Sequence, residues 1–180
     1  MHRRDMKNIL VVIGHPYWEK SVANKQIVEA LKATGQNITF SNIKELYPDC
    51  KLNVDAEQRK LLDADVIVFQ FPIMWYGAPS IMHKYFEEVL TYGFAYGPGG
   101  DKLKGKPLIA SCTAGAPENA YSRTGILGYT MDELMPPLTA TIVYCNMKWD
   151  GYVCSYGMMH PTSTTIDNHV SRLLDKINSL

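Results

Sequence analysis

Residues 71–79 of the chain read FPIMWYGAP and place two large aromatic side chains, Trp75 and Tyr76, among small and rigid neighbours. The apolar run over residues 65–71 is typical of a strand buried on both faces. Residues 79–90 carry apolar side chains three and four positions apart, which predicts a helix that begins near its proline. Open α/β sheets bind ligands at the carboxyl ends of their strands, so the loop is predicted to hold a flat heteroaromatic ligand. The alternative is a buried hydrophobic turn.

A second candidate site follows the apolar run over residues 8–14, which predicts another buried strand. The residues after it match neither the glycine fingerprint of dinucleotide-binding proteins nor a Walker loop. Ser21 is instead placed to cap a helix, whose exposed amides would bind a phosphate at its positive end. These amides belong to Val22, Ala23 and Asn24, and His15 can add a donor. The same residues also fit an ordinary capped helix with His15 in a turn.

A third candidate site follows the apolar run over residues 107–113, a further predicted strand. Its small residues would let backbone amides approach the edge of a ring, and they are Thr113, Ala114, Gly115 and Ala116. Tyr121 is the candidate catalytic side chain, because its hydroxyl could stabilise the negative charge that develops on a ring when hydride arrives. Alternatively, Tyr121 covers the pocket or contacts a second subunit.

The three loops need elements that bring them together, and the hydrophobic pattern predicts strands that alternate with helices. The strands are predicted over residues 8–14, 38–40, 65–71, 107–113 and 139–144, the last as an edge strand. The helices are predicted over residues 21–34, 55–62, 79–90, 131–138 and 164–177, with a loop over residues 43–51. This alternation predicts an α/β three-layer sandwich, a five-stranded parallel sheet with helices on both faces. In the order 2-1-3-4-5, the loops after strands one, three and four meet at one switch point, the position where flavodoxin-type proteins bind FMN.

Length and charge narrow the class of protein. The 180 residues fit one domain, residues 1–180, with a disordered or non-native leader expected over residues 1–5. Eighteen basic and eighteen acidic side chains cancel, so neither nucleic acid nor an anionic membrane is favoured as the main partner. No apolar run approaches the roughly 20 residues of a membrane span, and we expect a cytoplasmic protein.

The cysteines and histidines indicate no metal site. The four cysteines form no Cys-x-x-Cys pair and no zinc spacing, so they are predicted to be reduced thiols in the core or near the surface. A catalytic cysteine is the alternative. The histidines have no metal spacing either, and His83 and His169 are expected on helix surfaces.

Taken together, the motifs resemble a known family. They are His15-Pro16 with Ser21-x-x-Asn24, the loop of residues 71–79, GFAYG at residues 93–97, Thr113-x-Gly115, LYPD at residues 46–49 and YCNMKW at residues 144–149. The combination resembles the flavodoxin-like NAD(P)H:quinone oxidoreductases. It is most similar to their short bacterial branch, the ancillary subunits of glutathione-regulated potassium-efflux systems.

The resemblance implies a homodimer with one flavin per subunit, bound at the subunit interface. By the resemblance, His15, Ser21, Val22, Ala23 and Asn24 would hold the phosphate end of the flavin. Ile73, Met74, Trp75 and Tyr76 would lie along the isoalloxazine, with the amides of Trp75 and Tyr76 near its N5 and O4 edge. Thr113, Ala114, Gly115 and Ala116 would meet the N1 and O2 edge, and Tyr121 matches a tyrosine that larger relatives place near the ring.

One position departs from the larger relatives. They pair this tyrosine with a histidine six residues further on, and here that position is Leu127. A relay between two side chains is therefore not expected, and Tyr121 or backbone amides would stabilise the reduced ring alone. The chain also lacks the long C-terminal extension of the FAD-binding relatives, which favours FMN over FAD.

The leading hypothesis is thus an FMN-dependent NAD(P)H:quinone oxidoreductase that takes hydride from NADH or NADPH at flavin N5 and passes two electrons to a quinone. One aromatic-walled face would serve both substrates, which predicts ping-pong kinetics. The alternative is a regulatory subunit that docks on the cytosolic domain of a potassium-efflux transporter, peripheral to the membrane, with catalysis secondary or absent. A one-electron carrier of the flavodoxin type also fits the predicted fold.

Overall fold

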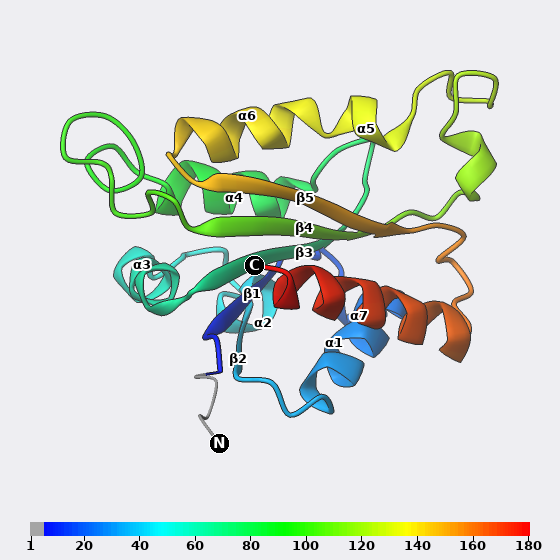
Figure 1. The fold of residues 1–180 in the computed structure, drawn as a ribbon, viewed down its shortest axis with the longest axis horizontal. Helices are drawn as coiled ribbons and strands as arrows, with labels where there is room; N and C mark the ends of the chain where they lie inside the picture. Colours follow the sequence, from blue (N-terminus) through cyan, green and yellow to red (C-terminus); the bar gives the residue numbers. More distant parts are fainter. Residues whose placement is uncertain (1–5) are drawn as a thin grey trace.

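The computed structural model describes residues 6–180, which form a five-stranded parallel sheet in the order β2-β1-β3-β4-β5 (Figure 1). The strands are β1 (Ile9–Ile13), β2 (Ile38–Asn42), β3 (Val66–Pro72), β4 (Pro107–Thr113) and β5 (Lys148–Ser155). The predicted strand order is confirmed. The leader predicted over residues 1–5 lies outside the described residues.

Helices cover both faces of the sheet, as predicted (Figure 1). They are η1 (Trp18–Lys20), α1 (Ala23–Lys32), α2 (Ile43–Leu46), α3 (Val54–Asp63), α4 (Ser80–Val89), η2 (Glu118–Ala120), α5 (Met131–Leu134), α6 (Pro136–Tyr144) and α7 (Ser163–Asn178). Helices α1 and α7 pack on one face, and α3, α4 and α6 pack on the other. No helix within residues 6–180 is long and apolar enough to cross a membrane.

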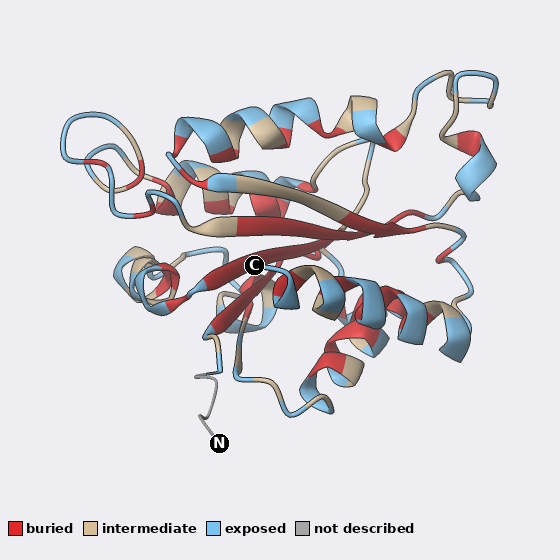
Figure 2. Ribbon diagram, viewed as in Figure 1, coloured by how far each residue is buried: buried red, intermediate tan, exposed pale blue. Residues whose placement is uncertain are grey.

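The central strands are buried on both faces because a layer of helices covers each side (Figure 2). Strand β1 is buried along its whole length, and β3 is buried up to Phe71. Strand β5 is one of the two edge strands, and only its last three residues are buried. The buried end of β5 is the carboxyl end, where the candidate site loops begin.

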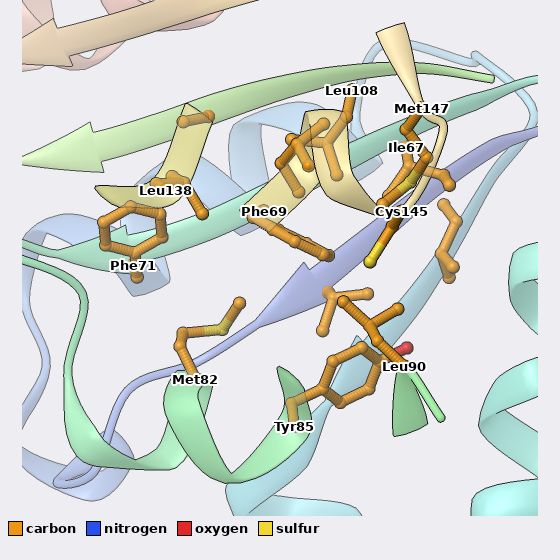
Figure 3. Packing of buried hydrophobic residues seen from close by; sticks show 14 of the residues in the cluster. Ile67, Phe69, Phe71, Met82, Tyr85, Leu90, Leu108, Leu138, Cys145 and Met147 are labelled. Carbon is orange, nitrogen blue, oxygen red and sulfur yellow. The ribbon is translucent and has the colours of Figure 1, made fainter. Parts of the chain in front are cut away.

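The core on the α4 and α6 face is built from large side chains of the sheet and these two helices (Figure 3). Phe69 of β3 meets Tyr85 of α4 edge-on, with ring centroids 6.1 Å apart. The backbone beyond β1 also approaches α4 so closely that a side chain at Gly14 would collide with Met82. This packing fixes the first turn of α4, and with it the loop that precedes the helix.

The fifth strand was predicted in the wrong place. Residues 139–144 belong to helix α6, whose buried Leu138 and Ile142 stand four residues apart. Pro136 and Pro137 begin this helix rather than interrupt one. The β-branched residues of this segment favoured a strand, but burial of one helical stripe against the sheet outweighs that preference. The true fifth strand, β5, follows four residues after α6 ends.

Smaller corrections concern helix ends. The predicted loop over residues 43–51 contains α2, which the side chain of Asn42 caps. Helix α3 begins at Val54, one residue before the predicted start, and the side chain of Asn53 caps it. Helix α1 begins at Ala23, so Ser21 lies one residue before its N-cap and makes no capping hydrogen bond. That last difference leaves the Ser21 hydroxyl free for another role.

Candidate functional site

Three buried polar side chains join the loops at the carboxyl edge of the sheet. Gln70 of β3 donates from Nε2 to Oδ1 of Asn24 at 2.6 Å, and Asn24 donates from Nδ2 to Oγ1 of Thr113 at 3.0 Å. All three residues are buried. They belong to β3, α1 and β4, so the loops after β1, β3 and β4 meet at one place, as the strand order predicts.

The start of α1 presents several unused donors. The first helical hydrogen bond runs from the N–H of Gln26 to the C=O of Val22 at 3.1 Å, so the amides of residues 22–25 precede the helical ladder. Beside them, Oγ of Ser21 is buried and has no hydrogen-bond partner among residues 6–180. A buried hydroxyl without a partner is unfavourable by about 1 to 3 kcal/mol. The combination fits a phosphate group, which would accept hydrogen bonds from both.

His15 lies behind this helix start as a neutral donor. Its Nδ1 accepts a hydrogen bond from the N–H of Tyr17 at 3.1 Å, which assigns the ring proton to Nε2. Burial lowers the pKa of His15, more than the nearby Glu19 carboxylate raises it. The ring therefore stays neutral near pH 7 and offers one N–H, which is the donor that the sequence predicted.

Residues 74–77, here named the aromatic turn, hold two bulky side chains in an unusual backbone shape. Met74 and Gly77 exchange two backbone hydrogen bonds, at 3.0 and 3.2 Å. Between them, Trp75 and Tyr76 have φ angles of +47° and +66°, the left-handed region that a tight hairpin turn requires at both central positions. Such backbone strain is of the order of 1–3 kcal/mol per residue and clusters at functional sites.

The aromatic turn faces solvent. The side chain of Trp75 is 94% exposed, which is extreme for an apolar residue of its size. The hydrogen bonds of the turn use the amides of Met74 and Gly77, so the amides of Trp75 and Tyr76 lie outside them. The buried hydrophobic turn weighed as an alternative is therefore wrong. What the structure presents is an open aromatic surface with two backbone donors beside it.

Residues 113–116, named the β4 loop, are held from several sides. The C=O of Thr113 accepts the N–H of Ile73 at 2.7 Å, which ties the β4 loop to the chain before the aromatic turn. Ala114 donates to the C=O of Ser155 at 2.8 Å and accepts from Met158 at 3.0 Å. None of these bonds uses the amides of residues 115 and 116, which stay available to a ligand.

The segment that supports the β4 loop was not predicted from the sequence. Residues 156–159 follow β5, and Gly157 donates to the C=O of Ala116 at 2.9 Å. Gly115 also lies close to this segment, since a Cβ there would be 3.2 Å from Sδ of Met159. The misplaced fifth strand hid this contact. A correct prediction of β5 over residues 148–155 would have revealed the contact, because β5 pairs in parallel with β4 and the loops after the two strands therefore lie side by side.

Tyr121 lies over the end of β5. Its ring packs against that of Tyr156, with centroids 5.3 Å apart and planes tilted by 49°. Burial raises the pKa of Tyr121, followed by the nearby Cys154, so the hydroxyl stays protonated and can donate. Leu127 lies in the wall of a 460 Å³ cavity together with Tyr76 of the aromatic turn, and its side chain adds no polar group there.

His169 was predicted on a helix surface, but the structure buries it completely. Its Nδ1 lies 2.9 Å from Oγ of Ser155, and its Nε2 lies 2.7 Å from Oγ of Ser111. Arg172 donates to the Ser155 oxygen at 2.8 Å, so the Ser155 hydroxyl joins the imidazole of His169 to the guanidinium of Arg172. Burial, followed by the Arg172 charge, lowers the pKa of His169 to about 4.

These hydrogen bonds join α7 to the ends of β4 and β5, and through Ser155 they support the β4 loop. Ser155 carries the carbonyl that accepts from Ala114, and His169 fixes the hydroxyl of the same residue. Ser111 stands two positions before the β4 loop on the neighbouring strand. The sequence prediction missed His169 because its role depends on the register of β5.

The chain matches the model of a flavodoxin-like fold over residues 7–177. The uncharacterized NAD(P)H oxidoreductase YrkL of Bacillus subtilis (strain 168) is 37% identical over 174 residues, which cover 97% of this chain and 99% of that protein. The glutathione-regulated potassium-efflux system ancillary protein KefF of Salmonella dublin is 41% identical over 141 residues, 78% of each chain.

Solved structures agree on the fold. The general stress protein 14 of Treponema denticola, in complex with FMN, has a TM-score of 0.83 and 28% identity, and the match covers 95% of this chain and 96% of that one. A structure described as a thermophilic tryptophan halogenase from Streptomycin violaceusniger has a TM-score of 0.86 and 31% identity, with 94% and 97% covered. Both likenesses show the same fold.

Proposed function

The chain belongs to the family with the flavodoxin-like fold, and from this membership we propose that it is an FMN-dependent NAD(P)H:quinone oxidoreductase. The observation that carries the proposal is the buried Ser21 hydroxyl without a partner, beside the unused amides at the start of α1. When bound, FMN supplies the redox chemistry, accepting hydride from NADH or NADPH at N5 and giving two electrons to a quinone. The relative YrkL, named as an NAD(P)H oxidoreductase, supports the donor.

The phosphate of FMN would be held without a basic side chain. Ser21 and the N–H of His15 would each donate one hydrogen bond, and the amides of Val22, Ala23 and Asn24 would donate from the positive end of α1. Asn24 already uses its side chain to join Gln70 and Thr113, so its contribution is its backbone amide. The FMN complex of the Treponema protein supports FMN as the flavin.

The ring would lie between the aromatic turn and the β4 loop. Ile73, Met74, Trp75 and Tyr76 would run along it, with the amides of Trp75 and Tyr76 toward N5 and O4. Thr113, Ala114, Gly115 and Ala116 would meet N1 and O2, where the free amides of residues 115 and 116 stabilise negative charge. Protonated Tyr121 adds a hydroxyl donor, and Leu127 supplies no second one.

The exposed aromatic turn also bears on assembly and kinetics. A single open face would serve donor and acceptor in turn, so we expect ping-pong kinetics. A side chain as exposed as that of Trp75 suits an interface, and we propose a homodimer in which a second subunit covers the ring.

The phosphate assignment is tested by comparing FMN with riboflavin, which lacks the phosphate. In fluorescence titrations, Ser21→Ala should weaken FMN binding about tenfold, the loss expected for one hydrogen bond to a charged group, and leave riboflavin binding unchanged. Ser171→Ala, on the exposed side of α7, is the control and should change neither. Equal FMN affinity in Ser21→Ala and the unmodified protein would contradict the assignment.

A second candidate function is favoured by the 41% identity to KefF. In this proposal, the protein regulates a potassium-efflux transporter by docking on its cytosolic side, and its own catalytic turnover is secondary. Co-purification with the transporter's cytosolic domain would support this function. Rapid quinone turnover by the isolated protein would make a partner unnecessary for catalysis.

A further inference from the structure

Two cysteines stand directly opposite one another on neighbouring strands. Cys112 of β4 and Cys154 of β5 are register partners in the parallel ladder. The pairing depends on a bulge in β5, because Leu108 faces Trp149 whereas Ala110 already faces Tyr152. The extra residue lies near Gly151, whose φ of +84° suits such an irregularity. Without the bulge, Cys112 would face Val153.

The two side chains also point to the same face of the sheet. Cys112 and Cys154 both belong to the core under α4 and α6. Their neighbours Ser111 and Ser155 point to the opposite face, where both contact His169. Neighbouring strands lie about 4.8 Å apart, and disulfides join residues whose Cα atoms are about 4.4 to 6.8 Å apart. The backbone therefore permits a bond between the two sulfurs.

Such a bond would be strained. Side chains of in-register neighbours leave the sheet nearly parallel, so their Cβ atoms are about as far apart as the strands, about 4.8 Å. A relaxed disulfide has its Cβ atoms at about 3.8 Å, so the strand ends would have to move closer together. Strained disulfides have higher reduction potentials and are easily reduced, which is the behaviour of regulatory rather than structural disulfides.

The two thiols have different roles in this geometry. Hydrogen bonding to the Cys154 sulfur, followed by burial, raises the pKa of Cys112 well above its usual value. Cys154 lines a surface cavity together with Ser155 and Tyr156, whereas Cys112 is not among the residues that line it, so Cys154 is the sulfur that an oxidant reaches. Cys154 lies close to Tyr121 and Tyr156, whose pKa values its charge would raise. The pair thus lies beneath the tyrosines that border the candidate site.

We propose that Cys112 and Cys154 form a redox-active dithiol that peroxides convert reversibly into a disulfide. The Cys154 sulfur attacks one peroxide oxygen, the O–O bond breaks, and water leaves after taking the thiol proton, which gives a sulfenic acid. The Cys112 sulfur then displaces the hydroxyl from Cys154, and a second water leaves as the S–S bond forms. One hydrogen peroxide is reduced to two waters, and two thiols are oxidised to one disulfide. A dithiol reductant reverses the reaction.

The cysteine pair lies next to the β4 loop, so a disulfide between the two cysteines should affect that loop. The next residues along the two strands, Thr113 and Ser155, hold the β4 loop. Drawing the strand ends together should move this loop and change the FMN affinity severalfold, a consequence that rests on the proposed function. Equal affinity of the oxidised and reduced protein would contradict the coupling, and this readout is separate from detection of the disulfide itself.

The test is intact-mass spectrometry and peptide mapping of the full chain after treatment with hydrogen peroxide. Cys50→Ser is the starting variant, because Cys50 is exposed and would react independently. We expect a loss of about 2 Da, a cross-linked peptide pair containing Cys112 and Cys154, and full recovery with dithiothreitol. Cys145→Ala, a buried thiol outside the pair, is the control and should still show the loss.

The single variants show whether both cysteines are required. Neither Cys112→Ala nor Cys154→Ala should lose the 2 Da, and Cys112→Ala should instead form a sulfenic acid that dimedone traps at Cys154. Overoxidation of separate cysteines without a cross-link, thiols that all survive peroxide, or a cross-link to Cys145 would each overturn the proposal. None of these readouts requires bound flavin.

Discussion

The aromatic turn and the β4 loop border the same edge of the sheet but are stabilised in opposite ways. The aromatic turn places Trp75 and Tyr76 in the left-handed region and leaves the indole of Trp75 in solvent. The β4 loop is buried at Thr113 and Ala114 and bonded to two neighbouring segments. The fold therefore stabilises the β4 loop by itself, whereas the aromatic turn stores strain that a ligand or a second subunit would have to compensate.

The difference separates two kinds of mutational effect. A change behind the β4 loop should lower the stability of the protein, with any effect on the ligand as a consequence. A change in the aromatic turn should weaken ligand binding without lowering stability.

Replacement of His169 should have the largest effect on stability. His169→Leu removes the buried partner of Ser111 and one of the two partners of Ser155, and we expect the free energy of unfolding to fall by about 3 kcal/mol. Urea denaturation measures this change. His83→Leu, on the exposed side of α4, is the matched control and should change stability by less than about 0.5 kcal/mol. Equal effects of the two variants would remove His169 from the support of the β4 loop.

Acid should act through the same residue. Burial lowers the pKa of His169 to about 4, whereas an unfolded chain binds that proton at a pKa of about 6.5. Below pH 6.5 the unfolded state therefore binds more protons than the folded one, and stability falls until about pH 4, by about 3 kcal/mol in total. His169→Asn, which cannot be protonated, should show a smaller fall between pH 7 and pH 4 in urea denaturation at each pH. An identical pH dependence of both proteins would contradict the burial of a neutral imidazole.

In the aromatic turn, stability and binding should change in opposite directions. Trp75→Gly and Trp75→Ala both remove the indole, but glycine adopts a positive φ without strain, so it should be more stable than the alanine variant by about 1 kcal/mol. Both variants should retain FMN less well than the unmodified protein during gel filtration. The control is Tyr144→Ala, an exposed aromatic residue at the end of α6, and it should retain FMN normally. Full retention by both Trp75 variants would exclude the turn as the bed of the ring.

Tyr121→Phe should have the smallest effect. Loss of one hydroxyl donor is worth about 1 kcal/mol, so quinone turnover should fall by about fivefold at most, with stability unchanged. Steady-state kinetics measure the change, and Tyr156→Phe, which alters the ring that packs on Tyr121, is the control. An unchanged turnover number would remove the Tyr121 hydroxyl from the mechanism and leave the backbone amides of the β4 loop as the sole donors there.

The same division governs what the sequence could predict. The strand order could be predicted because the unusual loops follow strands one, three and four, which meet at one switch point in the order 2-1-3-4-5. Residues 71–79 and Ser21 became candidates for the site through their types and spacing. The support of the β4 loop could not be predicted in this way. Gly151 and the bulge break the alternation of β5, and the β-branched residues of α6 have the pattern of a strand. Local pattern therefore could not predict the register of β5, which brings His169 and Tyr156 to the site.

Flavin binding and hydride transfer are tested most directly by the visible spectrum of the purified protein, recorded with added FMN under anaerobic conditions before and after NADPH, and then NADH, is supplied. We expect bound yellow flavin whose bands bleach within seconds and return when a quinone is added. Flavin that binds but is bleached by neither donor would contradict the oxidoreductase and favour a regulatory subunit or an electron carrier. A protein that takes up no FMN would contradict the assignment of all three loops.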